Sequence, residues 1–258
     1  LEFKDGDQNL PTAYFFFDTH YSPSLAADIS DAKFLFSDTT QTEEKLKKIK
    51  EGQEYIKNAL TCQIQIYRTL EQLLQEKKIS IAFDEGEQNG APVDYSSYFN
   101  KASTKREPTE RDSFYRKELP DIIKYQLSHG LGVFSVIYDF PVFGFESVPP
   151  ETLEEVAREV YTSFEDVWNH YVKHGEDQQY KVLKAKYDAA MKKVESLGKE
   201  RSDAAYDNSL TFAKQWLLEH PAAPKGYAVN IGSAHERDIL LRFMKADHPN
   251  AVLYVCGE

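Results

Sequence analysis

Short apolar runs separated by long segments with a helical period are the feature that most constrains how this chain can fold. The runs are rich in β-branched and aromatic residues and are flanked by turn formers, a pattern typical of buried strands. They cover residues 13–17, 33–36, 79–83, 133–138, 227–231 and 251–255. Strands joined through helices pair in parallel, because a parallel crossover needs about a dozen residues or more. We therefore predict the α/β fold class, with a mostly parallel central sheet flanked by helices.

The segments between the runs carry apolar residues at the spacing of amphipathic helices. The clearest of them is Thr42 to Gln75, which Gly52 could interrupt. The other predicted helices cover residues 118–128, 150–172, 178–197, 209–219 and 236–245. We expect a single domain over residues 1–258. Residues 151–197 are interpreted as a long helical insertion within it, which serves as a lid or as a dimer arm.

The composition argues against several classes of function. Of the 258 residues 41% are hydrophobic and 13% aromatic, which is enough to fill a sizeable core. The net charge of −11 disfavours binding to nucleic acid or to an anionic membrane, since both depend on basic patches. No apolar run approaches the roughly 20 residues of a membrane span, so no transmembrane segment is expected. The expected partner is a small-molecule or peptide ligand.

The cysteines and the first residues bear on the compartment. Cys62 and Cys256 are too few for a disulfide framework and lack the spacing of a metal knuckle, so we predict two separate thiols. Leu1 to Asn9 is polar and acidic rather than a signal peptide. The compartment stays open, with a secreted or periplasmic protein whose signal has been removed slightly favoured over a cytoplasmic one.

Polar side chains of the kind that bind ligands follow five of the predicted strands. They are Asp18-Thr19-His20, Ser37-Asp38-Thr39, Asp84-Glu85-Gly86, Asp139 and Gly232-Ser233-Ala234-His235. Ligands of parallel sheets bind beyond the carboxyl ends of the strands, where these residues would gather. Helix capping and turn formation are the alternative for Asp38, Thr39 and Asp139. We therefore expect the site to be built from His20, Glu85 and His235.

The residue types allow two kinds of chemistry at this edge. Imidazole and carboxylate together suit a divalent metal such as Mn, Co, Zn or Fe, with His20, His235, Glu85 and Asp38 as candidate ligands. Without a metal, a histidine beside a carboxylate can act as a general base for water. Both possibilities stay open. No phosphate-binding loop and no Gly-x-Ser-x-Gly elbow occurs in the sequence.

Several stretches resemble the superfamily that contains the erythromycin esterases, the haem-binding ChaN-like proteins and the TIKI/TraB/GumN group. Tyr14-Phe-Phe-Phe-Asp-Thr-His20 is similar to its first strand and Gly-x-x-His motif, and Asn230-Ile-Gly-Ser-Ala-His235 to its second. The stretch Gln63 to Leu74, followed by residues 79–86, resembles a ChaN-like helix and a strand that ends in an acidic residue. Asp207-Asn208 resembles the Arg-Asn pair that precedes the second motif. The likeness spreads thinly over the chain outside the insertion.

This sequence departs from the superfamily pattern at three points. Phe17 stands where the first motif has glycine. Asp207 stands where the pair has arginine, unless Arg201 reaches the site from further upstream. In TraB-like relatives the acidic residue follows the second strand, which would make it Asp38 rather than Glu85.

The resemblance implies a cleft with two histidines and a carboxylate. Members use it for metal-dependent peptide cleavage, for ester hydrolysis or for binding haem iron. Our first hypothesis is a hydrolase of the metal-dependent peptidase or esterase type. Its catalytic residues would be His20, Glu85, His235 and Asn208, and its substrate contacts Asp139, Asp207 and Arg201.

Two other hypotheses stay open. The first is a non-catalytic protein of the ChaN-like type that binds haem, iron or another small ligand, which the altered first motif and the many aromatic residues favour. The second is a scaffold in which the helices of residues 151–197 join two copies as a homodimer.

Overall fold

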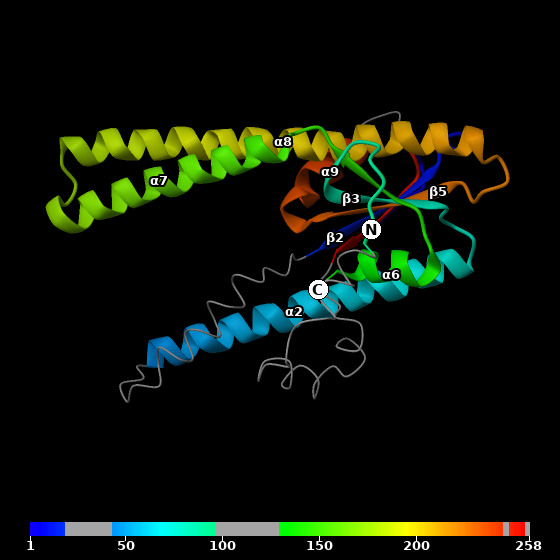
Figure 1. Cartoon of the computed structure of the whole chain (residues 1–258), viewed down its shortest axis with the longest axis horizontal. Helices are drawn as coiled ribbons and strands as arrows, with labels where there is room; N and C mark the ends of the chain where they lie inside the picture. Colours follow the sequence, from blue (N-terminus) through cyan, green and yellow to red (C-terminus); the bar gives the residue numbers. More distant parts are fainter. Residues whose placement is uncertain (19–42, 96–128, 245–247, 256–258) are drawn as a thin grey trace.

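The computed structural model describes residues 1–18, 43–95, 129–244 and 248–255. In this part of the chain six strands form one sheet (Figure 1). Their order is β1 (Glu2–Phe3), β6 (Ala251–Val255), β2 (Thr12–Asp18), β5 (Gly226–Gly232), β3 (Ile81–Gln88) and β4 (Val142–Glu146). All neighbours pair in parallel except β1, which runs antiparallel to β6 at the edge. The predicted fold class, α/β with a mostly parallel sheet, is confirmed.

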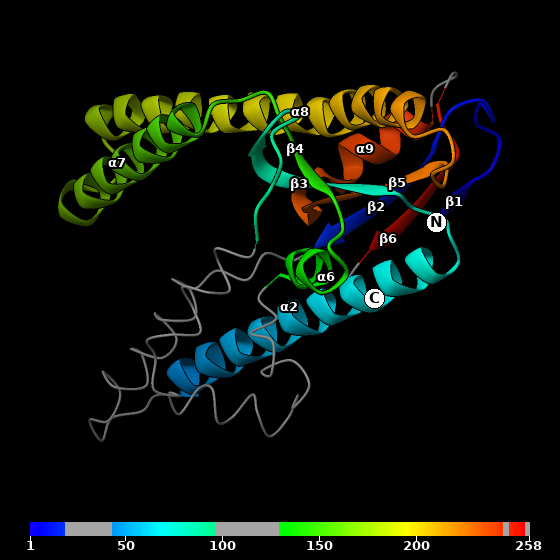
Figure 2. The ribbon, with the colours of Figure 1, turned by 45° about the vertical axis from the view of Figure 1, so that its right-hand side comes forward.

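Helices cover both faces of the sheet (Figures 1 and 2). One face packs on α2 (Glu43–Gln75) and α6 (Gly130–Tyr138), and the other on α8 (Gln178–Glu219) and α9 (Glu236–Phe243). Successive side chains of a strand point to opposite faces. In β2, Phe15 and Phe17 therefore join the core under α8, while Tyr14 and Phe16 join the core under α2. This two-sided burial explains why β2 is a continuous apolar run.

An arm of two long helices extends beyond the sheet (Figure 2). It consists of α7 (Pro150–His174) and the first half of α8. The Asp177 side chain starts α8 by accepting a hydrogen bond from the Tyr180 N–H at 2.8 Å. The helices predicted over residues 178–197 and 209–219 are one continuous helix. Its second half lies on the sheet, where Ala205 and Ala213 are buried, so residue 197 marks no boundary in the helix.

The strand predicted over residues 133–138 is wrong, because these residues belong to α6. The helix is capped by His129, whose Nδ1 accepts a hydrogen bond from the Gly132 N–H at 3.0 Å. Gly130 lets the helix approach α2 closely, since a Cβ there would lie 2.1 Å from the carbonyl oxygen of Gln63. Leu131 and other apolar residues of α6 then bury against α2 rather than in the sheet. The strand that takes the place of the predicted one is β4, which follows α6 directly.

The other predicted elements are present or lie outside the described residues, and the short edge strand β1 was not predicted. Helix α2 runs through Gly52 without a break. The strand predicted over residues 33–36 and the helix over residues 118–128 lie outside the described residues. Cys62 is in a disulfide, so the prediction of two separate thiols is wrong. None of the helices in the described ranges is long and apolar enough to cross a membrane.

Replacing Gly144 by alanine tests how closely β4 approaches β3. A Cβ at Gly144 would lie 2.3 Å from the carbonyl oxygens of Glu87 and Gln88. We expect Gly144→Ala to lower the free energy of unfolding in urea by about 1–3 kcal/mol. Gly198→Ala is the control, because its Cβ meets nothing within 4 Å in α8, and it should stabilise by up to about 1 kcal/mol. Equal effects of the two substitutions would contradict this close approach.

Candidate functional site

The predicted gathering of polar side chains lies at the carboxyl ends of the strands. Strand β3 continues to Gln88, so Glu85 lies within the strand rather than after it. The register sets Asp84 beside Asn230 of β5 and Asp18 beside Gly232. These positions bring acidic residues of β2 and β3 next to the turn that leads to His235.

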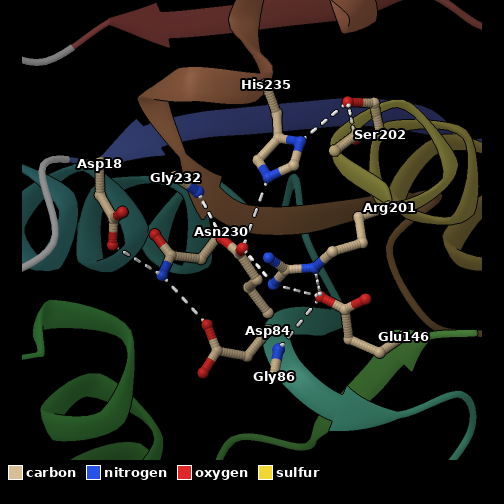
Figure 3. Close-up of polar contacts among 11 residues, drawn as sticks. Asp18, Asp84, Gly86, Glu146, Arg201, Ser202, Asn230, Gly232 and His235 are labelled. Carbon is tan, nitrogen blue, oxygen red and sulfur yellow. Dashed lines mark hydrogen bonds and ion pairs between the residues drawn. The ribbon is translucent and has the colours of Figure 1, made fainter. Parts of the chain in front are cut away.

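Arg201, which is partly buried, joins glutamates of two neighbouring strands to α8 (Figure 3). The Arg201 guanidinium donates to Glu146 Oε1 from Nε at 2.9 Å and from Nη2 at 2.7 Å, and Nη2 also forms an ion pair with Glu85. Glu146 Oε1 further accepts the Gly86 N–H at 3.4 Å. The side chains of Glu85 and Glu146 are almost fully buried, so the single guanidinium compensates two carboxylates that water barely reaches.

Glu85 also fixes the turn after β5. Its Oε2 accepts the Gly232 N–H at 2.6 Å, immediately before the short 3₁₀ helix η1 (Ser233–His235). This turn directs the His235 imidazole toward Glu85, with Nε2 lying 3.5 Å from Glu85 Oε1. One carboxylate therefore touches the arginine, the strand end and the histidine.

Ser202 holds the other side of the imidazole. Its hydroxyl lies 2.8 Å from His235 Nδ1 and donates to the Gly198 carbonyl oxygen at 2.9 Å. The hydroxyl has one proton, for which Gly198 and the Asp238 carboxylate at 3.4 Å are both acceptors, so we assign Ser202 as the acceptor for an N–H on Nδ1. In this tautomer Nε2 carries the lone pair and faces Glu85. Both Ser202 and His235 are buried, which keeps the ring orientation fixed.

A second polar cluster lies beside this site. The Asn230 amide donates to Asp18 at 3.1 Å and to Asp84 at 3.0 Å, and Gln63 donates to Asp18 at 3.2 Å. Asp84 also accepts from the Tyr95 hydroxyl and lies 3.3 Å from His129 Nε2. Burial by itself would raise the pKa of Asp84. The charge of His129 and the hydrogen bonds of His129, Tyr95 and Asn230 outweigh it and hold the pKa below its ordinary value.

The structure brings together three of the predicted site residues, Glu85, His235 and Arg201. Asn208 lies away from them and binds the end of β4, donating to the Phe145 carbonyl oxygen and to Ser147 Oγ, each at 2.9 Å. Asp207 forms an ion pair with Arg242 on α9. Asp139 is exposed and ends α6 in the left-handed conformation, with φ 50°. His20 and Asp38 lie outside the described residues.

Two residues of the site were missed in the sequence. Glu146 follows the run Val-Phe-Gly-Phe of β4, and the rule of polar residues at strand ends would have found it had that run been predicted as a strand. Ser202 lies in a charged stretch of helix, and no pattern in the sequence distinguishes it. Ser202 contacts His235 because it lies on the turn of α8 that faces the imidazole.

The donors in the described ranges do not by themselves fit a divalent metal. No group of three or more His, Cys, Asp or Glu side chains there is arranged to hold one. His235 and Glu85 do come together, but Arg201 already pairs with Glu85 Oε1 and places a positive charge where a metal would sit. The remaining predicted ligands, His20 and Asp38, lie outside these ranges.

Comparison of the chain with protein-family models, with curated proteins and with solved structures gives no match. The function has to be argued from the geometry of the site. That geometry combines an oriented imidazole, a carboxylate and a guanidinium at the edge where ligands of parallel sheets bind.

Removing the Arg201 side chain tests how far the fold depends on it. We expect Arg201→Ala to lower the free energy of unfolding by about 3–5 kcal/mol, because Glu85 and Glu146 would remain buried without their cation. The control is Lys193→Ala, which breaks the exposed pair with Glu159 and should lower the free energy of unfolding by about 1 kcal/mol or less. Urea unfolding at neutral pH measures both. Equal losses of unfolding free energy in the two variants would show that the burial of Glu85 and Glu146 does not increase the contribution of Arg201 to stability.

The depressed pKa of Asp84 predicts a pH-dependent contribution to stability. A carboxylate whose pKa is lower in the folded chain stabilises the fold above its unfolded pKa of about 3.9, and this is lost as the pH falls through the folded value. Asp84→Asn should therefore reduce the unfolding free energy at pH 7 by about 1–3 kcal/mol and progressively less below about pH 4. Exposed Asp207→Asn is the control. A deficit of Asp84→Asn that persists unchanged in acid would contradict the assignment.

Proposed function

We propose that the chain is a hydrolase of esters or amides in which His235 is the general base that activates water. The observation that supports this most is the setting of the imidazole. Nδ1 is held by buried Ser202, and Nε2 lies 3.5 Å from Glu85 Oε1. Two proton acceptors that lie this close can share the protons of one water molecule.

The reaction follows from these positions. A water bound between Nε2 and Glu85 gives a proton to Nε2 while its oxygen forms a bond to the substrate carbonyl carbon. Glu85 stabilises the imidazolium that results, as a carboxylate beside a catalytic histidine does. The proton then passes from Nε2 to the leaving oxygen or nitrogen as its bond to carbon breaks. Each step uses groups that β3, β5 and η1 hold in place.

Arg201 supplies the positive charge for the intermediate. Nε and Nη2 are engaged by the two glutamates, whereas Nη1 makes no hydrogen bond to the described residues. The side chain is one-fifth exposed, so a ligand can reach it. A guanidinium fixed beside the base stabilises the negative oxygen that forms when water attacks a carbonyl. In the superfamily pattern an arginine precedes the second motif, and Asp207 stands at that position in this chain. In our proposal Arg201 supplies the positive charge instead.

The resemblance supports the same class of reaction, since Gly232 and His235 keep the second Gly-x-x-His motif intact. A metal-dependent version would need ligands from outside the described residues, with His20 and Asp38 as the candidates, and no step above passes through a metal. Haem binding stays a prediction from the resemblance. Hydrolysis is preferred because a base, a carboxylate and a cation are all present in one cluster.

Replacing the proposed base tests this function. We expect His235→Ala to lower kcat/KM for p-nitrophenyl esters or peptide amides by about 10²–10⁴-fold, since general-base catalysis contributes that much. Glu85→Gln should lower it as well, with a smaller effect on KM than on kcat. The control is His220→Ala, because His220 is exposed and stacks on Trp216 far along α8.

Circular dichroism spectra should show that the variants remain folded. Wild-type activity in folded His235→Ala would rule out His235 as the base. A wild-type protein that hydrolyses no member of the ester and amide panel would overturn the proposal itself.

A further inference from the structure

The arm formed by α7 and α8 (Figure 1) carries a row of large apolar side chains that are exposed to solvent. They recur at alternating spacings of three and four along α7 and are 45–63% exposed. The row consists of Tyr161, Phe164, Trp168 and Tyr171. Such spacing places them on one stripe of the helix. Aromatic residues at this exposure mark a surface that is covered by something.

The stripe lies at the edge of the contact between α7 and α8, where two of its rings meet tyrosines of α8. Val156, Val160 and Val167 of α7 are less exposed than this row, and Val160 and Val167 lie one position before Tyr161 and Trp168. A matching row on α8 consists of Tyr180, Tyr187 and Val194, seven residues apart.

Ring contacts join the two rows into one surface. Phe164 lies 6.0 Å from Tyr187, and Tyr171 lies 5.7 Å from Tyr180, between ring centroids. We call this surface, made of the rows of α7 and α8, the aromatic face of the arm. It is about 21 Å long, from the 14 residue steps between Tyr180 and Val194 at 1.5 Å each.

We propose that the aromatic face binds the same face of a second copy of this chain, so that two arms form an antiparallel four-helix bundle. A surface that pairs with itself about a two-fold axis must be complementary to itself. Two helical hairpins with heptad-like apolar rows meet this condition, because the rows of one fill the grooves of the other.

The charges beside the stripe fit this antiparallel arrangement. Arg158 and Glu165 flank it on the side away from α8, seven residues apart and with opposite charge. An axis near Tyr161 and Phe164 brings Arg158 close to Glu165 of the second copy, and Glu165 close to the second Arg158. Arg158 makes no ion pair within the described ranges. It is therefore available for this contact.

The available area is adequate for a dimer. Fully burying an aromatic side chain removes roughly 150–250 Å² from water, so the half-exposed rings of two copies contribute about 800 Å². This is about half of the ~1,600 Å² of a standard interface. The row on α8 and the polar residues that flank the face supply the remainder.

A lipid surface fits the face less well. Helix α7 contains six acidic residues, Glu151, Glu154, Glu155, Glu159, Glu165 and Asp166, against only Arg158 and Lys173 as basic ones. Helices that lie on membranes have basic rather than acidic polar faces. The acidic flanks repel anionic headgroups, whereas in the proposed dimer Glu165 meets an arginine.

Sedimentation equilibrium of the full chain tests the proposal at about 100 μM, where association with a Kd of about 1–10 μM is nearly complete. We expect a dimer for the wild type and a monomer for Phe164→Glu/Trp168→Glu, with Kd raised at least about 100-fold. The control is Leu218→Glu, which removes an 82% exposed side chain from α8 beyond the arm and should leave the dimer intact.

Charge reversal tests the arrangement of the two copies. Arg158→Glu and Glu165→Arg should each weaken the dimer about two- to five-fold, and the double variant should restore it. A monomeric wild type at this concentration overturns the proposal. So does a wild type that stays monomeric but binds vesicles of phosphatidylcholine and phosphatidylglycerol through Trp168. Because none of these residues lies near His235, the outcome is independent of whether the chain is a hydrolase.

Discussion

The ion cluster of Arg201 with Glu85 and Glu146 is the interaction on which the rest of the site depends. The carboxylates of Glu85 and Glu146 come from neighbouring strands and are buried close to one another. Without a cation, their buried charges would strongly destabilise the folded chain. The guanidinium comes from α8, so charge compensation ties that helix to β3 and β4. Once Glu85 is held, its other oxygen fixes Gly232 and thus the turn that carries His235.

Helix α8 belongs both to the arm and to the layer that covers the sheet, because it is continuous from one to the other. Arg201 and Ser202 are adjacent in it and meet opposite ends of the His235–Glu85 pair. The aromatic face lies on the preceding turns. A helix is stiff along its axis, so a contact that fixes the arm also limits how far Arg201 and Ser202 can shift against the sheet. The proposed association of two copies would therefore involve the same helix that carries Arg201 and Ser202.

The sequence was sufficient to predict the strands that are buried on both faces. In β2, β5 and β6 apolar runs are continuous, and no helix pattern competes with them. The failure came at α6, where β-branched and aromatic residues resemble a strand but Gly130 and the cap at His129 favour a helix against α2. That error displaced the fourth strand and hid Glu146. His235 and Glu85 were found from their positions at strand ends, whereas Ser202 depends on a helix–turn contact between residues 33 apart in the chain.

The alternation of side chains along β3 explains why the polar residues at this edge form two clusters instead of one site. Asp84 and Glu85 are consecutive, so they point to opposite faces of the sheet. Asp84 joins Asn230 and His129 on the side of α2, and Glu85 joins Arg201 and His235 on the side of α8. Asp84 and Glu85 are therefore neighbours in the sequence but cannot act together in one site. The cluster under α8 contains an oriented imidazole and a guanidinium whose Nη1 makes no hydrogen bond to the residues that the structure describes. In the cluster under α2, Asn230 and Tyr95 instead direct their donors at the carboxylates, which favours a structural role for it.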